Sequence, residues 1–417
     1  MINYWAEHAW LPEGCRAAVR FTVTGSRFGE VVAGMSPQAD DHLLRGVTLP
    51  GLANGHSHAF HRALRGRTQG DGGTFWTWRQ QMYAVAGRLD PDSYYELARQ
   101  TYAEMLEAGF TCVGEFHYLH HDRDGAAYAD PNAMGLALIA AAADAGIRLT
   151  LLDTLYLAGG LDNYGHRPLN EVQRRFSDDS AEAWADRVSA LGSSPTIRIG
   201  AAVHSMRAVP EADLAVVGGL IGDRPLHVHV SEQPAENAVI RAFYDRTPTE
   251  LLDDHGLLGP RTTAVHATHL TDADITRLGA SGTSACICPT TERDLADGIG
   301  PSRRLADAGC PLTLGSDQHA VIDPFEELRE LEMHQRLVTG QRGQFTPAEL
   351  ITAASVAGYR SLGWEYGGEL RAGGMADFVV VDDDSNRTRG ALPAQIGYAA
   401  TGADVIMVVV DGKVVVG

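Results

Sequence analysis

A His-x-His pair, His56 and His58, follows directly after the apolar residues 47–54. Alternate side chains of an extended chain point to the same side, so the two imidazoles should face one way, about two residues of rise apart. Imidazole nitrogens are ligands that zinc and several other transition metals favour in proteins. The pair therefore predicts part of a metal site.

Three more groups, His229, His266 and Asp317, lie where other apolar, strand-like runs end. Three imidazoles and a carboxylate suit a divalent ion such as zinc and leave one coordination position for water. The pKa of such a water falls towards about 7, and Asp317 and His266 are placed to accept its proton. A single histidine would more simply satisfy local hydrogen bonds, but five groups at strand ends favour one hydrolytic site.

Competing histidines stand beside two of these groups. His227 and His229 share a strand face, and we assign His229 because it lies nearer the C-terminal end; His227 is then a supporting residue. His269, in contrast to His266, should lie in the following loop. Glu232 falls just beyond the strand that ends at residue 230, where it can deliver a proton to a leaving nitrogen. The alternative for Glu232 is a surface glutamate.

Strand-like and helix-like segments alternate from about residue 47 onward. Helices are predicted over 92–108, 132–145, 178–191 and 247–255, the first two ended by glycine. Eight strand-helix units predict a (β/α)8 barrel, whose active site lies at the C-terminal ends of the strands. An open doubly wound sheet would scatter the polar groups along an edge. The predicted strands cover residues 47–54, 111–117, 148–155, 196–203, 226–230, 262–267, 284–288 and 311–316.

The two ends of the chain contain short β runs joined by turns, including an Asp-Gly hairpin signal at residues 411–412. We therefore predict an α/β protein in which residues 48–365 form the TIM-like barrel. Residues 1–47 and 366–417 together form a small β-sandwich beside it.

The composition excludes several classes of function. A net charge of -19 argues against nucleic acid as a partner, because phosphate binding needs a basic surface. No apolar run reaches the roughly 20 residues of a membrane span, and the N-terminus lacks the features of an export signal. Five cysteines in such a chain do not suggest a disulfide framework. We expect a cytoplasmic protein with neither membrane nor nucleic acid as a partner.

The residues at the strand ends resemble the amidohydrolase superfamily: a strand-one His-x-His, histidines after strands five and six, and an aspartate after strand eight. Glu232 resembles the deaminase branch. Some members bridge two metals with a modified lysine, but Lys413 is the only lysine here. The resemblance thus implies one divalent ion, preferably Zn²⁺, held by His56, His58, His229 and Asp317, with His266, Asp317 and Glu232 as catalytic groups.

Longer strings resemble the formimidoylglutamate deiminases of histidine degradation across essentially the whole chain. They cover residues 55–60, 75–79, 115–118 and 288–292. That family converts N-formimino-L-glutamate and water into N-formyl-L-glutamate and ammonia, and the resemblance further suggests a homodimer. It implies that the substrate is bound by Arg79, Tyr118, His204, Arg207 and His61.

The substrate assignment has physical support, because guanidinium groups such as those of Arg79 and Arg207 bind carboxylates with paired hydrogen bonds. His61 stands where many relatives have glutamine. One alternative is a deaminase of nucleobases or related heterocycles, with Trp76, Trp78 and Tyr118 stacking on a ring. Another is a non-catalytic barrel that serves as a scaffold.

Overall fold

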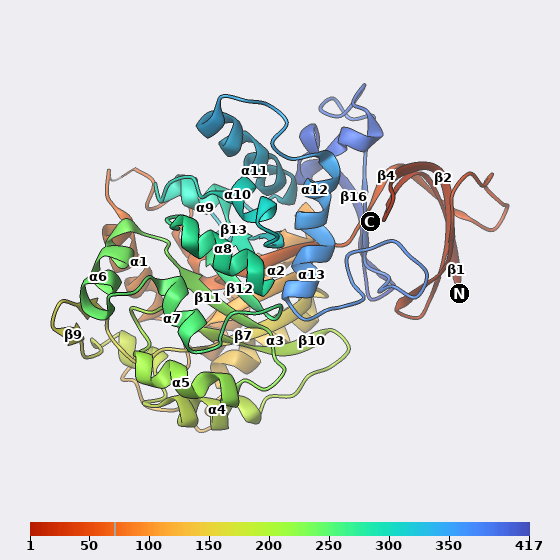
Figure 1. Cartoon of the computed structure of the whole chain (residues 1–417). Coiled ribbons are helices and arrows are strands. Elements are labelled where there is room, and N and C mark those ends of the chain that lie inside the picture. The colour runs from red at the N-terminus through yellow and green to blue at the C-terminus, as the bar shows by residue number, and fades with distance from the viewer. Residues whose placement is uncertain (71) are drawn as a thin grey trace.

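Eight parallel strands form the central sheet of the protein, a computed structural model that describes residues 1–70 and 72–417 (Figure 1). Their spatial order follows the chain, as a (β/α)8 barrel requires. The predicted barrel is thereby confirmed, and each predicted strand after the first matches an observed one closely. The strands are β5 (Leu52–Ser57), β6 (Phe110–His117), β7 (Arg148–Leu155), β10 (Ile197–Val203), β11 (Leu226–Val230), β12 (Thr262–His266), β13 (Ser284–Ile287) and β14 (Leu312–Leu314).

The barrel closes where the chain leaving β14 meets the end of β5. The Asp317 N–H donates to the carbonyl of His56 at 3.0 Å, and the His58 N–H donates to the carbonyl of Asp317 at 3.1 Å. Ser57 and Asp317 form a parallel bridge. Closure therefore places three of the predicted metal-binding residues side by side at the C-terminal end of the barrel.

Helices surround the strands (Figure 1). Gly109 and Gly146 end two of them with φ values of 107° and 89°, as predicted for left-handed stop residues. The helices are α1 (Phe75–Ala86), α2 (Pro91–Ala108), α3 (Ala133–Ala145), α4 (Ala181–Ser189), α5 (Glu211–Leu220), α6 (Pro234–Tyr244), α7 (Pro248–Asp254), α8 (Asp272–Ser281), α9 (Pro289–Asp294), α10 (Ser302–Asp307), α11 (Pro324–Thr339), α12 (Pro347–Thr352) and α13 (Gly358–Ser361). A short hairpin joins β8 (Leu161–Asp162) to β9 (Gly165–His166).

The predicted strand over residues 47–54 is divided between two sheets. β4 (His42–Pro50) pairs with strands of the terminal sheet, and the chain enters β5 of the barrel after Gly51. A Cβ at Gly51 would lie 2.6 Å from the Thr111 hydroxyl oxygen, so only glycine fits at this crossing. The domain boundary at residue 47 stays a prediction.

Both termini build one seven-stranded sheet beside the barrel, in the order β17-β16-β15-β4-β1-β2-β3. A flat sheet would separate β15 and β3 by roughly 19 Å. The rings of Phe28 on β3 and Phe378 on β15 nevertheless lie 6.1 Å apart, so the sheet curls around an aromatic core. The other strands are β1 (Ile2–Leu11), β2 (Gly14–Thr24), β3 (Arg27–Val32), β15 (Phe378–Val381), β16 (Val405–Val410) and β17 (Lys413–Val416).

A buried ion pair joins the barrel to the terminal sheet. Arg148 at the start of β7 donates to Asp377 through Nε at 2.9 Å and Nη2 at 3.1 Å, and neither side chain is more than 1% exposed. Asp377 also accepts from the Tyr359 hydroxyl and the Asp411 N–H. The Asp377 carboxylate thus accepts hydrogen bonds from four donor groups, which belong to the barrel and to the terminal sheet.

Asp377→Asn should lower the free energy of unfolding by about 3 to 5 kcal/mol, because it leaves the Arg148 charge buried without its partner. Urea unfolding followed by circular dichroism measures this change. Asp384→Asn is the matched control, since the Asp384–Arg389 pair is exposed and should leave the midpoint nearly unchanged. Equal midpoints for both variants would contradict this role of Asp377.

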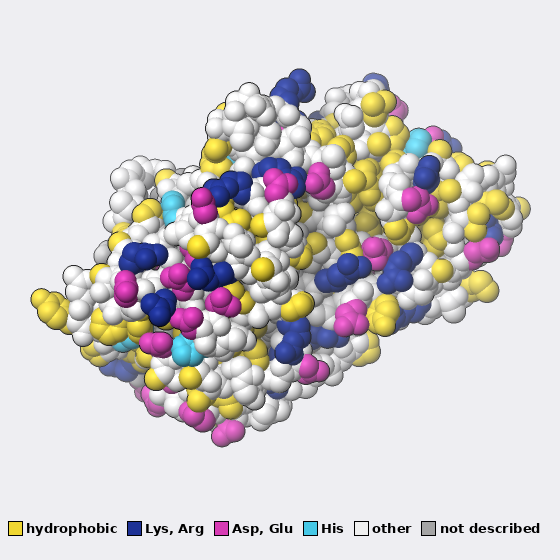
Figure 2. Space-filling view, viewed as in Figure 1, with side chains coloured by type: hydrophobic (Ala, Val, Ile, Leu, Met, Phe, Trp, Pro, Cys, Tyr) yellow, Lys and Arg dark blue, Asp and Glu magenta, His cyan; other side chains and the backbone are white. Residues whose placement is uncertain are grey.

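Basic and acidic side chains are interspersed on the face shown in Figure 2. Among the described residues, no helix is both long and apolar enough to cross a bilayer. The expectation that nucleic acid is not a partner stays a prediction from the net charge.

Candidate metal centre and active site

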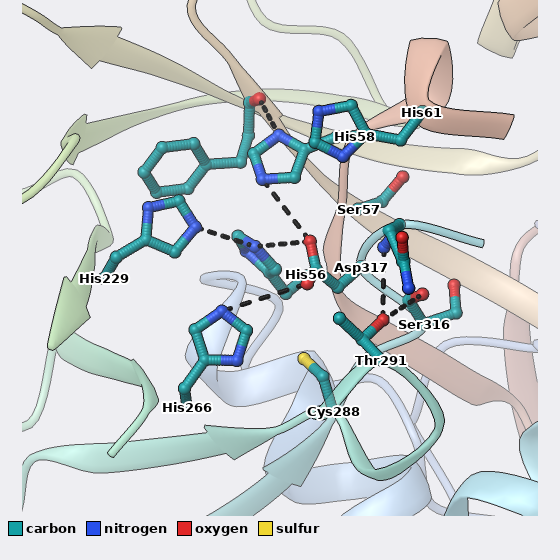
Figure 3. A network of polar contacts seen from close by, with 12 residues as sticks. His56, Ser57, His58, His61, His229, His266, Cys288, Thr291, Ser316 and Asp317 are labelled. Atoms are coloured by element: carbon teal, nitrogen blue, oxygen red, sulfur yellow. Dashed lines mark hydrogen bonds and ion pairs between the residues drawn. The ribbon is translucent and has the colours of Figure 1, made fainter. Parts of the chain in front are cut away.

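The five groups predicted at the strand ends converge in one cluster (Figure 3). Asp317 Oδ1 lies 3.4 Å from His56 Nε2 and 3.5 Å from His58 Nε2, and the His229 and His56 Nε2 atoms are 3.1 Å apart. His266 Nε2 lies 3.9 Å from Asp317 Oδ2. One ligand atom each from His56, His58 and His229 lies within 4.8 Å of the others, as in a site that can hold a metal ion.

Hydrogen bonds behind the cluster fix the orientation of two rings. His58 Nδ1 lies 2.9 Å from the carbonyl of Phe116, and His229 Nδ1 lies 2.9 Å from the carbonyl of His204. A carbonyl only accepts, so each Nδ1 is the donor and each Nε2 directs its lone pair into the cluster. This is the tautomer that a metal ligand requires.

The protonation states also suit a cation. Burial lowers the pKa of His58 to about 3 and lowers the pKa values of His56 and His229, so these imidazoles are neutral. Burial alone would raise the pKa of Asp317, but hydrogen bonding to His56 and the neighbouring imidazoles bring it below its usual value. Neutral imidazoles beside an ionised carboxylate are the forms that bind a divalent ion.

His266 lies among three carboxylates. Its Nε2 is 3.8 Å from Glu232, and its Nδ1 is 3.4 Å from Glu292. Although burial opposes protonation, these carboxylates and Asp317 raise the pKa of His266, while burial raises the pKa of Glu232. The two predicted proton-handling groups therefore stand together with altered acidity, as catalytic groups commonly do.

Left-handed backbone conformations occur at the ends of three strands. His266 has φ 68° and Asp317 has φ 40°, and Ser231 and His319 also have positive φ values. Non-glycine residues adopt this conformation at a cost of about 1 to 3 kcal/mol, and such strain is often found clustered at functional sites. In this barrel the strained residues turn the ends of β11, β12 and β14 at the candidate site.

A pocket opens above the cluster. Every predicted catalytic and substrate-binding residue contributes to its lining: His61, Arg79, Tyr118, His204, Arg207, Glu232, His266 and Asp317. The assignment of a role to each stays a prediction.

Contacts within the pocket distinguish these residues. His61 Nε2 lies 3.1 Å from the Tyr118 hydroxyl, and the Arg79 guanidinium lies 4.6 Å above the Trp76 ring. Arg207 lies 3.5 Å from Glu232. Its Nε lies 3.6 Å from Glu236, which is too long for a hydrogen bond, and has no hydrogen-bond partner among the described residues. Arg207 therefore lines the pocket beside two carboxylates.

The competing histidines lie outside the pocket lining. His227 Nε2 lies 3.1 Å from the carbonyl of Ser361, and His269 Nε2 lies 2.8 Å from the carbonyl of Asp297 in a loop. Both placements agree with the preference for His229 and His266.

Sequence reasoning missed the residues behind the cluster. Glu115 accepts hydrogen bonds from the Ser57 hydroxyl at 2.6 Å and the Ala59 N–H at 2.7 Å, and burial raises its pKa to about 8. His319 lies 3.0 Å from Ser57 on the other side. The alternation of side chains along the strand does not distinguish Glu115 from an ordinary core position. The available signal was its residue type, because a carboxylate inside an apolar strand is unusual.

The profile of the Amidohydrolase family matches residues 47–415, and the chain belongs to this family. A formimidoylglutamate deiminase of Pseudomonas aeruginosa is 39% identical over 92% of this chain and 86% of that protein. An 8-oxoguanine deaminase of the same species is 31% identical over 89% of this chain and 84% of that protein. The resemblance predicted from the motifs is thereby confirmed.

Solved structures agree with the family. An amidohydrolase from Brucella melitensis matches with a TM-score of 0.93 and 34% identity, covering 100% of this chain and 95% of that one. An adenosine deaminase from Xanthomonas campestris with bound zinc matches with a TM-score of 0.83 and 25% identity, covering 99% and 92%.

Proposed function

We propose that this protein hydrolyses N-formimino-L-glutamate to N-formyl-L-glutamate and ammonia, using one divalent ion, preferably Zn²⁺. The observation that carries the proposal is one pocket lined by two arginines together with Glu232, His266 and Asp317. A substrate with two carboxylates and an amidine-like carbon needs cationic groups beside a proton-handling site. The 39% identical formimidoylglutamate deiminase supports the same substrate.

The donor set of His56, His58, His229 and Asp317 would hold the ion, which when bound would polarise a water molecule and lower its pKa towards about 7. The ionised Asp317 accepts a proton as water attacks the formimino carbon. His266 stabilises the charge that develops on the atoms bonded to the carbon as it becomes tetrahedral. Glu232, whose pKa burial raises, protonates the leaving nitrogen so that it departs as ammonia.

The direct test is ammonia release from N-formimino-L-glutamate by purified, metal-loaded protein, with metal-free protein as the control. We expect turnover that depends on the ion. Ammonia release no faster than in the control would overturn the proposal, and a protein purified without chelators yet free of metal would favour the scaffold alternative.

Arg207→Ala should reduce kcat/KM for N-formimino-L-glutamate by about a hundredfold to a thousandfold, because a buried charge-assisted contact to a carboxylate is lost. The variant also distinguishes the substrate classes, since a neutral heterocycle makes no such contact. Arg304→Ala, which removes an arginine of an exposed ion pair, is the control. Turnover of a nucleobase that Arg207→Ala leaves intact would favour the heterocycle alternative.

The aromatic rings that would stack on a heterocyclic substrate are only partly accessible. The face of Trp76 is covered by Arg79 at 4.6 Å, and Trp76 is absent from the pocket lining, whereas Trp78 and Tyr118 belong to it. This arrangement favours the acyclic substrate. A place in histidine degradation and a homodimer follow from the resemblance, and a cytoplasmic location follows from the apolar runs and the N-terminal sequence; all three remain proposals.

A further inference from the structure

Gln173 is a buried amide that contacts two tyrosines of the pocket. Its Nε2 lies 2.8 Å from the Tyr156 hydroxyl and 3.0 Å from the Tyr83 hydroxyl. Both tyrosines line the pocket, yet neither could be predicted from the metal-binding motifs. Gln173 itself is 2% exposed and is absent from the pocket lining.

The orientation of the Gln173 amide is fixed from behind. The Asn170 N–H donates to Gln173 Oε1 at 3.0 Å, and an N–H can only meet an acceptor. The amide nitrogen therefore faces the tyrosines, where it also lies 3.2 Å from the carbonyl of Gly159. A flipped amide would set its nitrogen against the Asn170 N–H and its oxygen against that carbonyl.

The two amide hydrogens face three acceptors, the two tyrosine hydroxyls and the Gly159 carbonyl, and the amide nitrogen itself accepts none, so neither tyrosine can donate to Gln173. Their two O–H hydrogens must find acceptors elsewhere. The hydroxyls also hydrogen-bond each other, which uses one hydrogen. Among the described residues no other acceptor is recorded for the pair, so one O–H remains as a donor.

Cationic groups stand beside this donor. The Arg79 guanidinium lies 5.5 Å from the centre of the Tyr83 ring, and Arg207 lines the same pocket. Tyr156 follows β7, which is across the barrel from β13 and β14 in the strand order, and therefore lies away from Asp317. A hydroxyl donor with guanidinium groups is a site for an anion at a distance from the reacting carbon.

We propose that the hydroxyl pair of Tyr83 and Tyr156, whose one remaining O–H cannot turn towards Gln173, binds with Arg79 the side-chain carboxylate of the substrate. The assignment rests on the proposed function, and it makes these tyrosines specificity-determining residues. Gln173 is a positioning residue that acts through them. The α-carboxylate, which shares the α-carbon with the nitrogen retained in the product, is left to the remaining groups.

The test compares N-formimino-L-glutamate with N-formimino-L-norvaline, which keeps the α-carboxylate and replaces the side-chain carboxylate by methyl. Tyr83→Phe and Tyr156→Phe should each raise KM for the glutamate substrate about tenfold and leave kcat within about twofold. KM for the norvaline substrate should change by less than about twofold. Tyr244→Phe, which removes a hydroxyl bonded to His166 outside the pocket, is the control.

Gln173→Glu tests the orientation itself. Its carboxylate would accept from both tyrosines and turn their hydrogens away from the substrate, so KM for the glutamate substrate should rise more than for the norvaline substrate. Gln173→Met, of similar size, removes the amide without adding a new acceptor. Its KM for the glutamate substrate should therefore rise less than that of Gln173→Glu. Because Tyr156 is buried, the half-buried Tyr83 provides the variant that folds most safely, and thermal midpoints verify folding.

Unchanged KM values in the tyrosine variants, or equal rises with both substrates, overturn the carboxylate assignment while the proposed function stands. A wild-type protein that does not turn over N-formimino-L-glutamate overturns both.

Discussion

Asp317→Asn should reduce kcat/KM for N-formimino-L-glutamate by about a thousandfold. The substitution keeps the size of the side chain but removes the carboxylate that, among the described residues, alone contacts both His56 and His58 at the barrel closure. Asparagine is a neutral and weaker ligand, and it cannot accept the proton of the attacking water. Ammonia release under steady-state conditions measures the effect.

Metal content of the same Asp317→Asn preparation separates the two roles. A full complement of metal with little activity would assign the loss to proton transfer, and a reduced complement would assign it to binding. Asp384→Asn, at an exposed position, controls for a general effect of the substitution. If Asp317→Asn kept more than about a tenth of wild-type activity, neither role would hold.

Glu232→Gln should lower kcat by about a hundredfold to ten-thousandfold, because an amide cannot protonate the departing nitrogen. Glu232 is buried and its pKa is raised, so the acid form persists to higher pH than in an ordinary glutamate. A general acid works while protonated, and wild-type kcat should therefore fall as pH rises through that pKa. The variant should lose this alkaline limb together with most of its rate.

Glu326→Gln is the matched control, because Glu326 pairs with Arg293 at the surface. Full activity in Glu232→Gln, or an unchanged alkaline limb at reduced rate, would show that another group protonates the departing nitrogen.

The sequence was sufficient to predict the barrel and its polar cluster because both depend on strand ends. In a closed barrel these ends meet, so His56, His229 and Asp317 were predicted to be neighbours although they are far apart in the chain. The same reasoning preferred His229, which lies in the cluster beside His56, to His227, whose ring contacts the Ser361 carbonyl instead.

Other features had no such signal. Residues 47–54 are mostly apolar throughout, so their hydrophobicity does not show that one strand ends at Pro50 and the next begins at Leu52. The close approach of Thr111 to Gly51 at this crossing is visible only in the structure. Tyr83 lies on a helix and Gln173 in a connecting segment, so neither occupies a strand end. Their association depends on tertiary packing, which hydrophobic periodicity does not specify.

Zinc titration of metal-free protein, with ammonia release from N-formimino-L-glutamate as the readout, tests the central claim most directly. Activity should rise in proportion to added zinc and reach its plateau at one ion per chain. Full activity before any metal is added, or a plateau that requires two ions, would contradict the account.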